Sequence, residues 1–294
     1  GYQAGDIDIA NKNANALTIQ GTLQSSGTLE LTNSAGDIKQ AGGLLQATNI
    51  DLAAKQIGED GKAIQLNSNV AIAGDAAHSA AKFAAKAIGT GTVSASGAGL
   101  VHLEEISGDL RVGKIQSAAG NTAASKVVLE ANGSIVNGDA NSLIQADRVN
   151  LIADNGTLGT AKDILRVQTG TPLTAAGTVD YSQAATATGA KYGLNAKAHG
   201  SICLENIKGD LFLDRAVSDT GDVSLKTAGA MVDNEVDEHI DQRSWDQLTK
   251  YWSDLGLVAG SEAAKQRLAD AQNDYRLNMN ASYQEYWASQ GQIS

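Results

Sequence analysis

The stretch LLQATNIDLAA at residues 44–54 decides the fold, because it joins a short alternating run to a polar turn. Within NIDLAA, apolar residues recur at every second position, which is the period of a β-strand with one buried face. A similar stretch, LIQADRVNLIA, follows at residues 143–153, so that Gln46 corresponds to Gln145. Repetition at an offset of about 100 residues is typical of a repeat architecture.

Two further pairs of segments extend the repeat. HLEEISGDLRV at 102–112 matches CLENIKGDLFL at 203–213, and VVLEANGSIV at 127–136 echoes VSLKTAGAMV at 223–232. Glycine, Asn-Gly and Gly-Asp steps between the runs supply the turn conformations that sharp corners need. We therefore expect two successive units of about 100 residues, in which three strands make a coil of roughly 20 to 30 residues.

This pattern predicts a mainly β fold over residues 1–232, namely a parallel β-helix or solenoid. Coils stacked at about 4.8 Å satisfy one another's backbone groups, and their apolar side chains fill a narrow core. Such a core suits Ile, Leu, Val and Ala, in keeping with an aromatic content of only 4% in the whole chain. A β-sandwich is the alternative, but it would need two-residue hairpin signals between adjacent strands.

Composition excludes several classes of protein. The 294 residues include one cysteine and four histidines, so an intramolecular disulfide or a usual Cys/His zinc site is not expected. A formal net charge of -11 without any basic run argues against nucleic acid as a partner. No apolar stretch is long enough to span a bilayer, so we expect no membrane insertion of this segment. The chain opens at Gly1 without a leader pattern, which suggests a piece of a longer protein.

Two stretches interrupt the strand pattern. Residues 75–88 are Ala-rich with apolar residues at helical spacing, which predicts a short helical excursion. Residues 171–199 are rich in Thr, Ala and Gly and carry the single proline, Pro172. This second stretch is expected to be a long loop.

The last part of the chain, residues 233–294, changes to helical spacing and holds all three tryptophans. A first run ends at Gly256 and a second begins at Ser261, a good N-cap, which predicts an antiparallel α-helical hairpin. The hairpin is either an insertion, which we favour, or the end of the coils. Its aromatic residues are either the hairpin core or a surface that binds a sugar or a protein. These possible partner-binding residues are Trp245, Tyr251, Trp252, Tyr283, Tyr286 and Trp287.

Several phrases, among them GDIKQAGGLLQATNIDLAA and VHLEEISGDLRVGKI, resemble the repeats of filamentous-haemagglutinin-type exoproteins and leukotoxin-type filamentous adhesins. The resemblance covers roughly residues 1–232. It implies a right-handed β-helical filament, exported by a two-partner route and displayed at the bacterial cell surface. It also implies attachment to a protein or glycan of a host or neighbouring cell, or a role in biofilm. We expect no counterpart of that family's N-terminal export domain within these residues, so export is implied by the resemblance alone.

Catalytic chemistry is not expected from the sequence. Adjacent acids occur at Glu59-Asp60, Glu104-Glu105 and Asp237-Glu238, but Glu104-Glu105 has a partial echo at residues 205–206 and reads as a solvated or turn-capping feature of the repeat. Lone Cys203 lies in a strand pattern, and no nucleophile, phosphate or calcium motif is present. We expect no enzyme, no cofactor and no metal.

The sequence therefore predicts a display segment of a large secreted adhesin, with self-association through the hairpin as a further possibility. The alternative is a carbohydrate-binding or polysaccharide-degrading β-helix that uses a groove along one strand face. Three or more acidic or aromatic side chains converging in one cleft would favour that alternative.

Overall fold

The computed structural model describes residues 2–69, 91–117, 125–170, 176–178 and 192–234. All of the described strands belong to the first of two units, Gly1–Val236. The second unit, Asp237–Ser294, lies outside the described residues, and with it the predicted hairpin. The predicted helical excursion at 75–88 also lies outside them.

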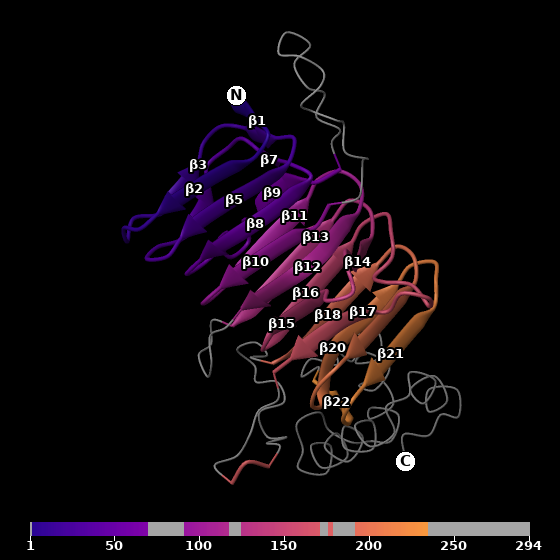
Figure 1. The fold of residues 1–294 in the computed structure, drawn as a ribbon. Helices are drawn as coiled ribbons and strands as arrows, with labels where there is room; N and C mark the ends of the chain where they lie inside the picture. The colour runs from indigo at the N-terminus through magenta and orange to yellow at the C-terminus, as the bar shows by residue number, and fades with distance from the viewer. Residues whose placement is uncertain (1, 70–90, 118–124, 171–175, 179–191, 235–294) are drawn as a thin grey trace, which may run out of the picture. The chain divides into compact units, whose positions relative to one another are not determined.

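The described residues form a parallel β-solenoid of about eight turns and contain no helix (Figure 1). Two long parallel sheets run through its turns. Sheet A has the order β1 (Tyr2–Ala4), β4 (Leu23–Ser25), β7 (Leu45–Gln46), β9 (Ile64–Asn67), β11 (Val101–Glu105), β13 (Lys126–Ala131), β16 (Arg148–Ala153), β18 (Gly193–Ala198), β20 (Leu211–Ser218) and β22 (Met231–Asp233). Sheet B has the order β2 (Ile7–Asn11), β5 (Thr28–Asn33), β8 (Asn49–Ala54), β10 (Val93–Gly97), β12 (Leu110–Ser117), β15 (Leu143–Ala146), β17 (Leu165–Thr169), β19 (Ile202–Asn206) and β21 (Val223–Thr227). The predicted parallel solenoid is thus confirmed.

The third side of each turn is much shorter than the other two. It holds the pair β3 (Leu17–Ile19) and β6 (Ile38–Gln40), and β14 (Ile135–Asn137) pairs with the start of β12. Elsewhere single bridges continue it, such as those from Ile57 to Ile38 and to Val101. The extended backbone of this side ends at Ile57, because the next residue, Gly58, has a φ of 79° and turns the chain.

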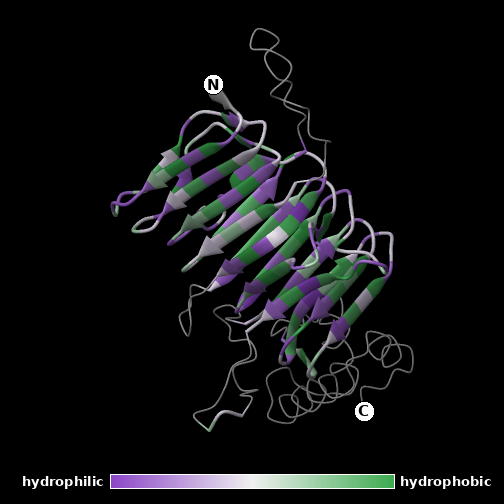
Figure 2. Ribbon diagram, in the orientation of Figure 1, coloured by the Kyte–Doolittle hydropathy of each residue, from purple (hydrophilic) through white to green (hydrophobic). Residues whose placement is uncertain are grey.

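Inward-facing apolar side chains stack in columns along the solenoid. In sheet B the paired residues Leu29, Ile50, Val93 and Val112 are all fully buried. Figure 2 shows the alternation of apolar and polar residues along the strands. Each column buries side chains between neighbouring turns, which is how a short strand that would be unstable alone becomes stable.

The two copies of the repeat occupy opposite sheets. LLQATNIDLAA supplies β7 of sheet A and β8 of sheet B, whereas LIQADRVNLIA supplies β15 of sheet B and β16 of sheet A. The other two matched pairs of segments are exchanged in the same way. The repeat offset therefore corresponds to a whole number of turns plus one half.

The predicted long loop at residues 171–199 is wrong at its C-terminal end. β18 (Gly193–Ala198) is a strand of sheet A, paired with β16 and β20. Its inward residues Leu194, Ala196 and Ala198 are fully buried. The sequence GLNAKA has a low intrinsic β-propensity, and pairing on both sides within the sheet overrides it.

Candidate functional site

The six aromatic residues predicted as a partner-binding surface all lie outside the described residues. They are Trp245, Tyr251, Trp252, Tyr283, Tyr286 and Trp287. Whether they form a core or a surface stays a prediction.

The adjacent acids of the described part make structural contacts. Glu59 accepts an ion-pair hydrogen bond from Lys39 at 2.9 Å, and Asp60 pairs with Lys126 at 3.1 Å. Glu104 accepts a hydrogen bond from Gln65 at 2.9 Å. Asp237-Glu238 lies outside the described residues. None of these carboxylates lines the groove described below.

Glu105 is fully buried and caps a corner of the solenoid. It accepts hydrogen bonds from the backbone N–H of Ser68 at 2.9 Å and from the Ser68 hydroxyl at 2.6 Å. Burial raises the pKa of the Glu105 carboxyl to about 7, against the opposing effect of these hydrogen bonds. Of the two roles expected for the Glu104-Glu105 pair, solvated or turn-capping, Glu105 has the second: it caps a turn and is shielded from solvent.

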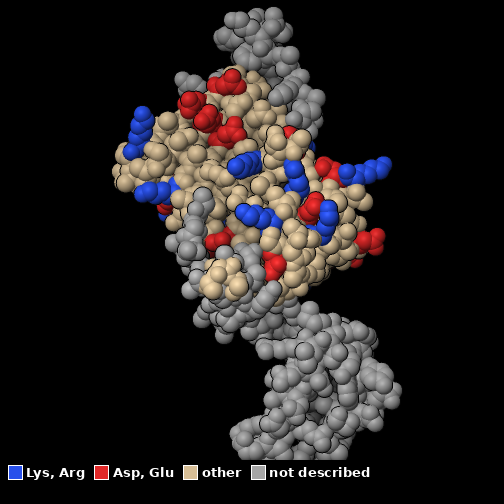
Figure 3. Space-filling view, turned by 60° about the horizontal axis from the view of Figure 1, so that its bottom comes forward, with Lys and Arg blue, Asp and Glu red and all other residues tan. Residues whose placement is uncertain are grey.

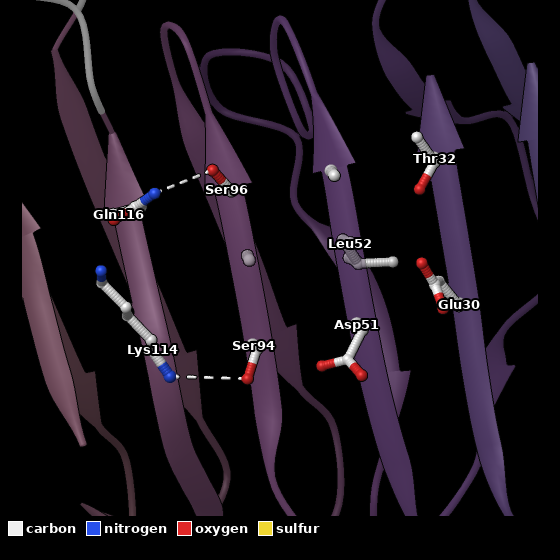
Figure 4. A pocket seen from close by; sticks show the side chains of 10 residues that line it. Glu30, Thr32, Asp51, Leu52, Ser94, Ser96, Lys114 and Gln116 are labelled. Carbon is white, nitrogen blue, oxygen red and sulfur yellow. Dashed lines mark hydrogen bonds between the residues drawn. The ribbon is translucent and has the colours of Figure 1, made fainter. Parts of the chain in front are cut away.

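A groove lies on the outer face of sheet B, across β5, β8, β10 and β12 (Figure 4). Its cavity measures about 140 Å³ and opens to solvent. The first wall carries Glu30 and Thr32, and the opposite wall carries Lys114 and Gln116. The floor between the walls is formed by Asp51, Ala53, Ser94 and Ser96, whose side chains are short. We refer to these eight residues as the sheet B groove.

A β-bulge shapes the wall that carries Lys114. Val93 pairs with Val112 and Ala95 pairs with Ile115, so Ser94 lies opposite both Gly113 and Lys114. An extra residue of this kind redirects the side chain that follows it. As a result Lys114 is exposed on the outer face, whereas Ile115 next to it is fully buried.

The lining of the groove carries charges of both signs, and in Figure 4 the Lys114 side chain points away from Asp51. Asp51 is half-buried, and desolvation raises the pKa of its carboxyl, while a hydrogen bond from the Ser94 hydroxyl acts in the other direction. Lys114 lies two strands away, beyond Ser94 (Figure 4). Two strand spacings amount to about 10 Å, too far for a direct ion pair between the side chains of Asp51 and Lys114 without closing the groove.

Figure 3 shows a group of acidic side chains on one part of the face in view, and acidic and basic side chains interspersed over the remainder. The described residues hold no group of three or more His, Cys, Asp or Glu side chains placed to bind a metal ion. Cys203 is buried on β19. Among the described residues we find no helix with the length and apolar character needed to cross a membrane.

Comparisons of the chain with protein-family models, with curated proteins and with solved structures gave no match. The fold and its groove are therefore the basis for a functional proposal.

Sequence reasoning offered a groove along one strand face as an alternative but did not identify the residues of the sheet B groove. The alternation in NIDLAA places Asp51 outward, and the alternation in SASG at residues 94–97 places Ser94 and Ser96 outward. The sequence does not reveal which turns are neighbours. Ser94 follows Asp51 by 43 positions and Lys114 follows it by 63, yet the three residues lie on successive turns. The one signal available was Gly113, which interrupts an alternating run and is typical of a bulge.

Proposed function

We propose that this chain is a display segment of a large secreted adhesin of a bacterial cell surface. The observation that supports the proposal is the uninterrupted parallel pairing of sheet A and sheet B through successive turns. A stack of this kind is stiff and repetitive, and it is extended by adding turns, which suits a spacer that holds binding elements away from a cell.

The resemblance to filamentous-haemagglutinin-type repeats adds a right-handed coil, two-partner export and a role in attachment or biofilm to this proposal. The partners would be proteins or glycans on a host or neighbouring cell. Nucleic acid is not proposed as a partner, because the net charge is -11. The proposal contains no catalysed reaction and no cofactor.

Cell binding tests the proposal and locates the recognition element. Beads coated with the full chain are expected to attach to epithelial cells or to neighbouring bacteria more strongly than beads coated with an unrelated acidic protein. A chain carrying Trp245→Ala, Trp252→Ala and Trp287→Ala shows whether the C-terminal aromatic residues contribute. Equal retention of the full-chain beads and the control beads would contradict the adhesin proposal.

A second candidate function is carbohydrate binding, which the sheet B groove favours. Its lining combines carboxylates, an ammonium group, hydroxyls and an amide, the groups that exchange hydrogen bonds with sugar hydroxyls. Binding of the full chain to a glycan array tests it. Loss of the bound glycans when the groove is filled by Ala53→Ile and Ser94→Asn would assign them to this face.

A further inference from the structure

The second copy of the repeat provides an internal comparison for the sheet B groove. The matched sequence segments equate β8 with β16 and β12 with β20. The strands paired with them extend the comparison, so that β5 of sheet B corresponds to β13 of sheet A, and β10 corresponds to β18. The β-bulge is present in both copies, because Leu194 pairs with Leu213 and Asn195 pairs with Arg215. The row Glu30, Asp51, Ser94 and Lys114 thus corresponds to the row Val128, Asn150, Asn195 and Arg215.

The groove is present in the first copy because the side chains of its floor are small. Ala53 and Ser96 correspond to Ile152 and Lys197 in the second copy, and Ser94 corresponds to Asn195. The same backbone arrangement therefore accepts larger residues at every one of these positions. Since the solenoid does not require short side chains there, the opening in the first copy needs another reason than packing.

The charges of the groove also differ from those elsewhere on the same face. Glu205 and Lys226 are direct neighbours on β19 and β21 and form an ion pair at 2.7 Å. In the groove, Asp51 and Lys114 are held apart by Ser94, and no ion pair of Glu30, Asp51 or Lys114 occurs within the described part of the chain. The groove therefore keeps charges of both signs apart, with the hydroxyls of Ser94 and Ser96 on the floor between them.

We propose that the sheet B groove binds a carboxylated sugar, with the sugar carboxylate against the Lys114 ammonium, hydroxyls of the same ring donating to Asp51, and the next ring of the chain donating to Glu30. Ser94, Ser96 and Gln116 lie between or beside these groups and supply further donors and acceptors. A cavity of about 140 Å³ is smaller than the pockets that enclose drug-sized ligands, and it suits one ring of a chain that continues into solvent.

The position of Lys114 favours an acidic sugar over an amino sugar. Lys114 is exposed on a bulge and is the one cation among the residues that line the groove, so a ligand carboxylate that reaches its ammonium gains a charge-assisted contact. Asp51 is half-buried beside the Ser94 hydroxyl, an environment that suits hydrogen bonds from neutral hydroxyls. This inference rests on carbohydrate binding as the second candidate function.

Calorimetric titration of the full chain tests the inference with three probes: trigalacturonic acid, its methyl ester and a glucosamine trimer. We expect the acid to bind, and the ester to bind about tenfold more weakly because the charge-assisted contact with Lys114 is lost. Lys114→Gln is expected to weaken binding of the acid about tenfold, to the level of the ester. Lys226→Gln, on the same face but outside the groove, is the matched control and should leave the affinity unchanged.

A second variant fills the groove without altering its charge. Ala53→Ile with Ser94→Asn introduces residues that the second copy already carries, so the fold is expected to persist, as the circular dichroism spectrum would show. This variant should abolish binding of the acid. Unchanged affinity of the acid in both Lys114→Gln and the filled variant would overturn the proposal, as would preferential binding of the glucosamine trimer.

The remaining outcomes separate the inference from the function beneath it. Equal affinities for acid and ester, both lost in the filled variant, would leave carbohydrate binding in place and overturn the role of the carboxylate. Absence of binding by all three probes at millimolar concentration would overturn the carboxylated-sugar inference, and an empty glycan array would then remove carbohydrate binding as well.

Discussion

Glu105 and Asn206 fill the same corner in the two copies of the repeat, one on sheet A and the other on sheet B. Both side chains are buried, with exposed fractions of 0% and 1%. Glu105 accepts hydrogen bonds from Ser68, and the Asn206 amide oxygen accepts one from the backbone N–H of Thr169 at 3.1 Å. Asn206 also donates to the carbonyl of Lys208 at 3.0 Å. The corner therefore needs a polar cap, and a neutral amide serves as well as a carboxyl group.

This equivalence predicts the effect of Glu105→Gln on the pH dependence of stability. Because burial raises the pKa of Glu105 from 4.5 to about 7, the native state keeps a proton that the unfolded state loses between these values. The free energy of unfolding should therefore fall as the pH rises through this window, by about 3 kcal/mol in total. Glu105→Gln removes the titration and should flatten the profile, which urea unfolding at pH 5 and pH 8 would measure.

Glu104→Gln is the matched control for this prediction. Glu104 is the neighbouring carboxylate on β11, only part-buried, and its bond from Gln65 lies at the exposed surface. Its replacement should leave the slope between pH 5 and pH 8 as it is in the natural chain. A Glu105→Gln variant that retains the full slope would show that another group is responsible for it.

The strands and the inward-facing residues could be predicted from the sequence, because both depend on local alternation. NIDLAA at β8 places Ile50 and Leu52 in the core, and both are buried. Register between turns could not be predicted, since it depends on the bulge at Gly113 and on the long stretch between β9 and β10. The sequence alone equates Gln46 with Gln145. Only the strand pairing shows that Gln46 lies on sheet A and Gln145 on sheet B.

The corner glycines that follow Ile57 and Leu158 give a second prediction. Gly159 has a φ of 64°, and a Cβ there would lie 2.5 Å from the backbone oxygen of Cys203. Gly159→Ala should therefore lower the free energy of unfolding by more than about 2 kcal/mol, from backbone strain and from the close contact together. Thermal unfolding followed by circular dichroism would measure the loss.

Two other glycines separate these contributions. Gly61 has a φ of 70° but open space around a Cβ, so Gly61→Ala should show only the strain, about 1–2 kcal/mol. Gly21 has neither feature, and Gly21→Ala should change stability by less than about 0.5 kcal/mol. Similar losses for Gly159→Ala and Gly61→Ala would contradict the importance of the close contact with Cys203.

Ile57 and Ile106 form a matched pair that tests the core of the solenoid. Ile57 is fully buried and makes single bridges to Ile38 and Val101, whereas Ile106 is 38% exposed at a corner. Ile57→Ala removes a side chain from the stacked column and leaves a cavity, which should cost about 2–5 kcal/mol. Ile106→Ala removes the same atoms from a partly solvated position and should cost less than about 1.5 kcal/mol. Denaturant unfolding of the two variants, followed by circular dichroism, compares them directly. Equal losses would mean that the short third side adds no more to stability than the corner surface does, and that sheets A and B alone hold the turns together.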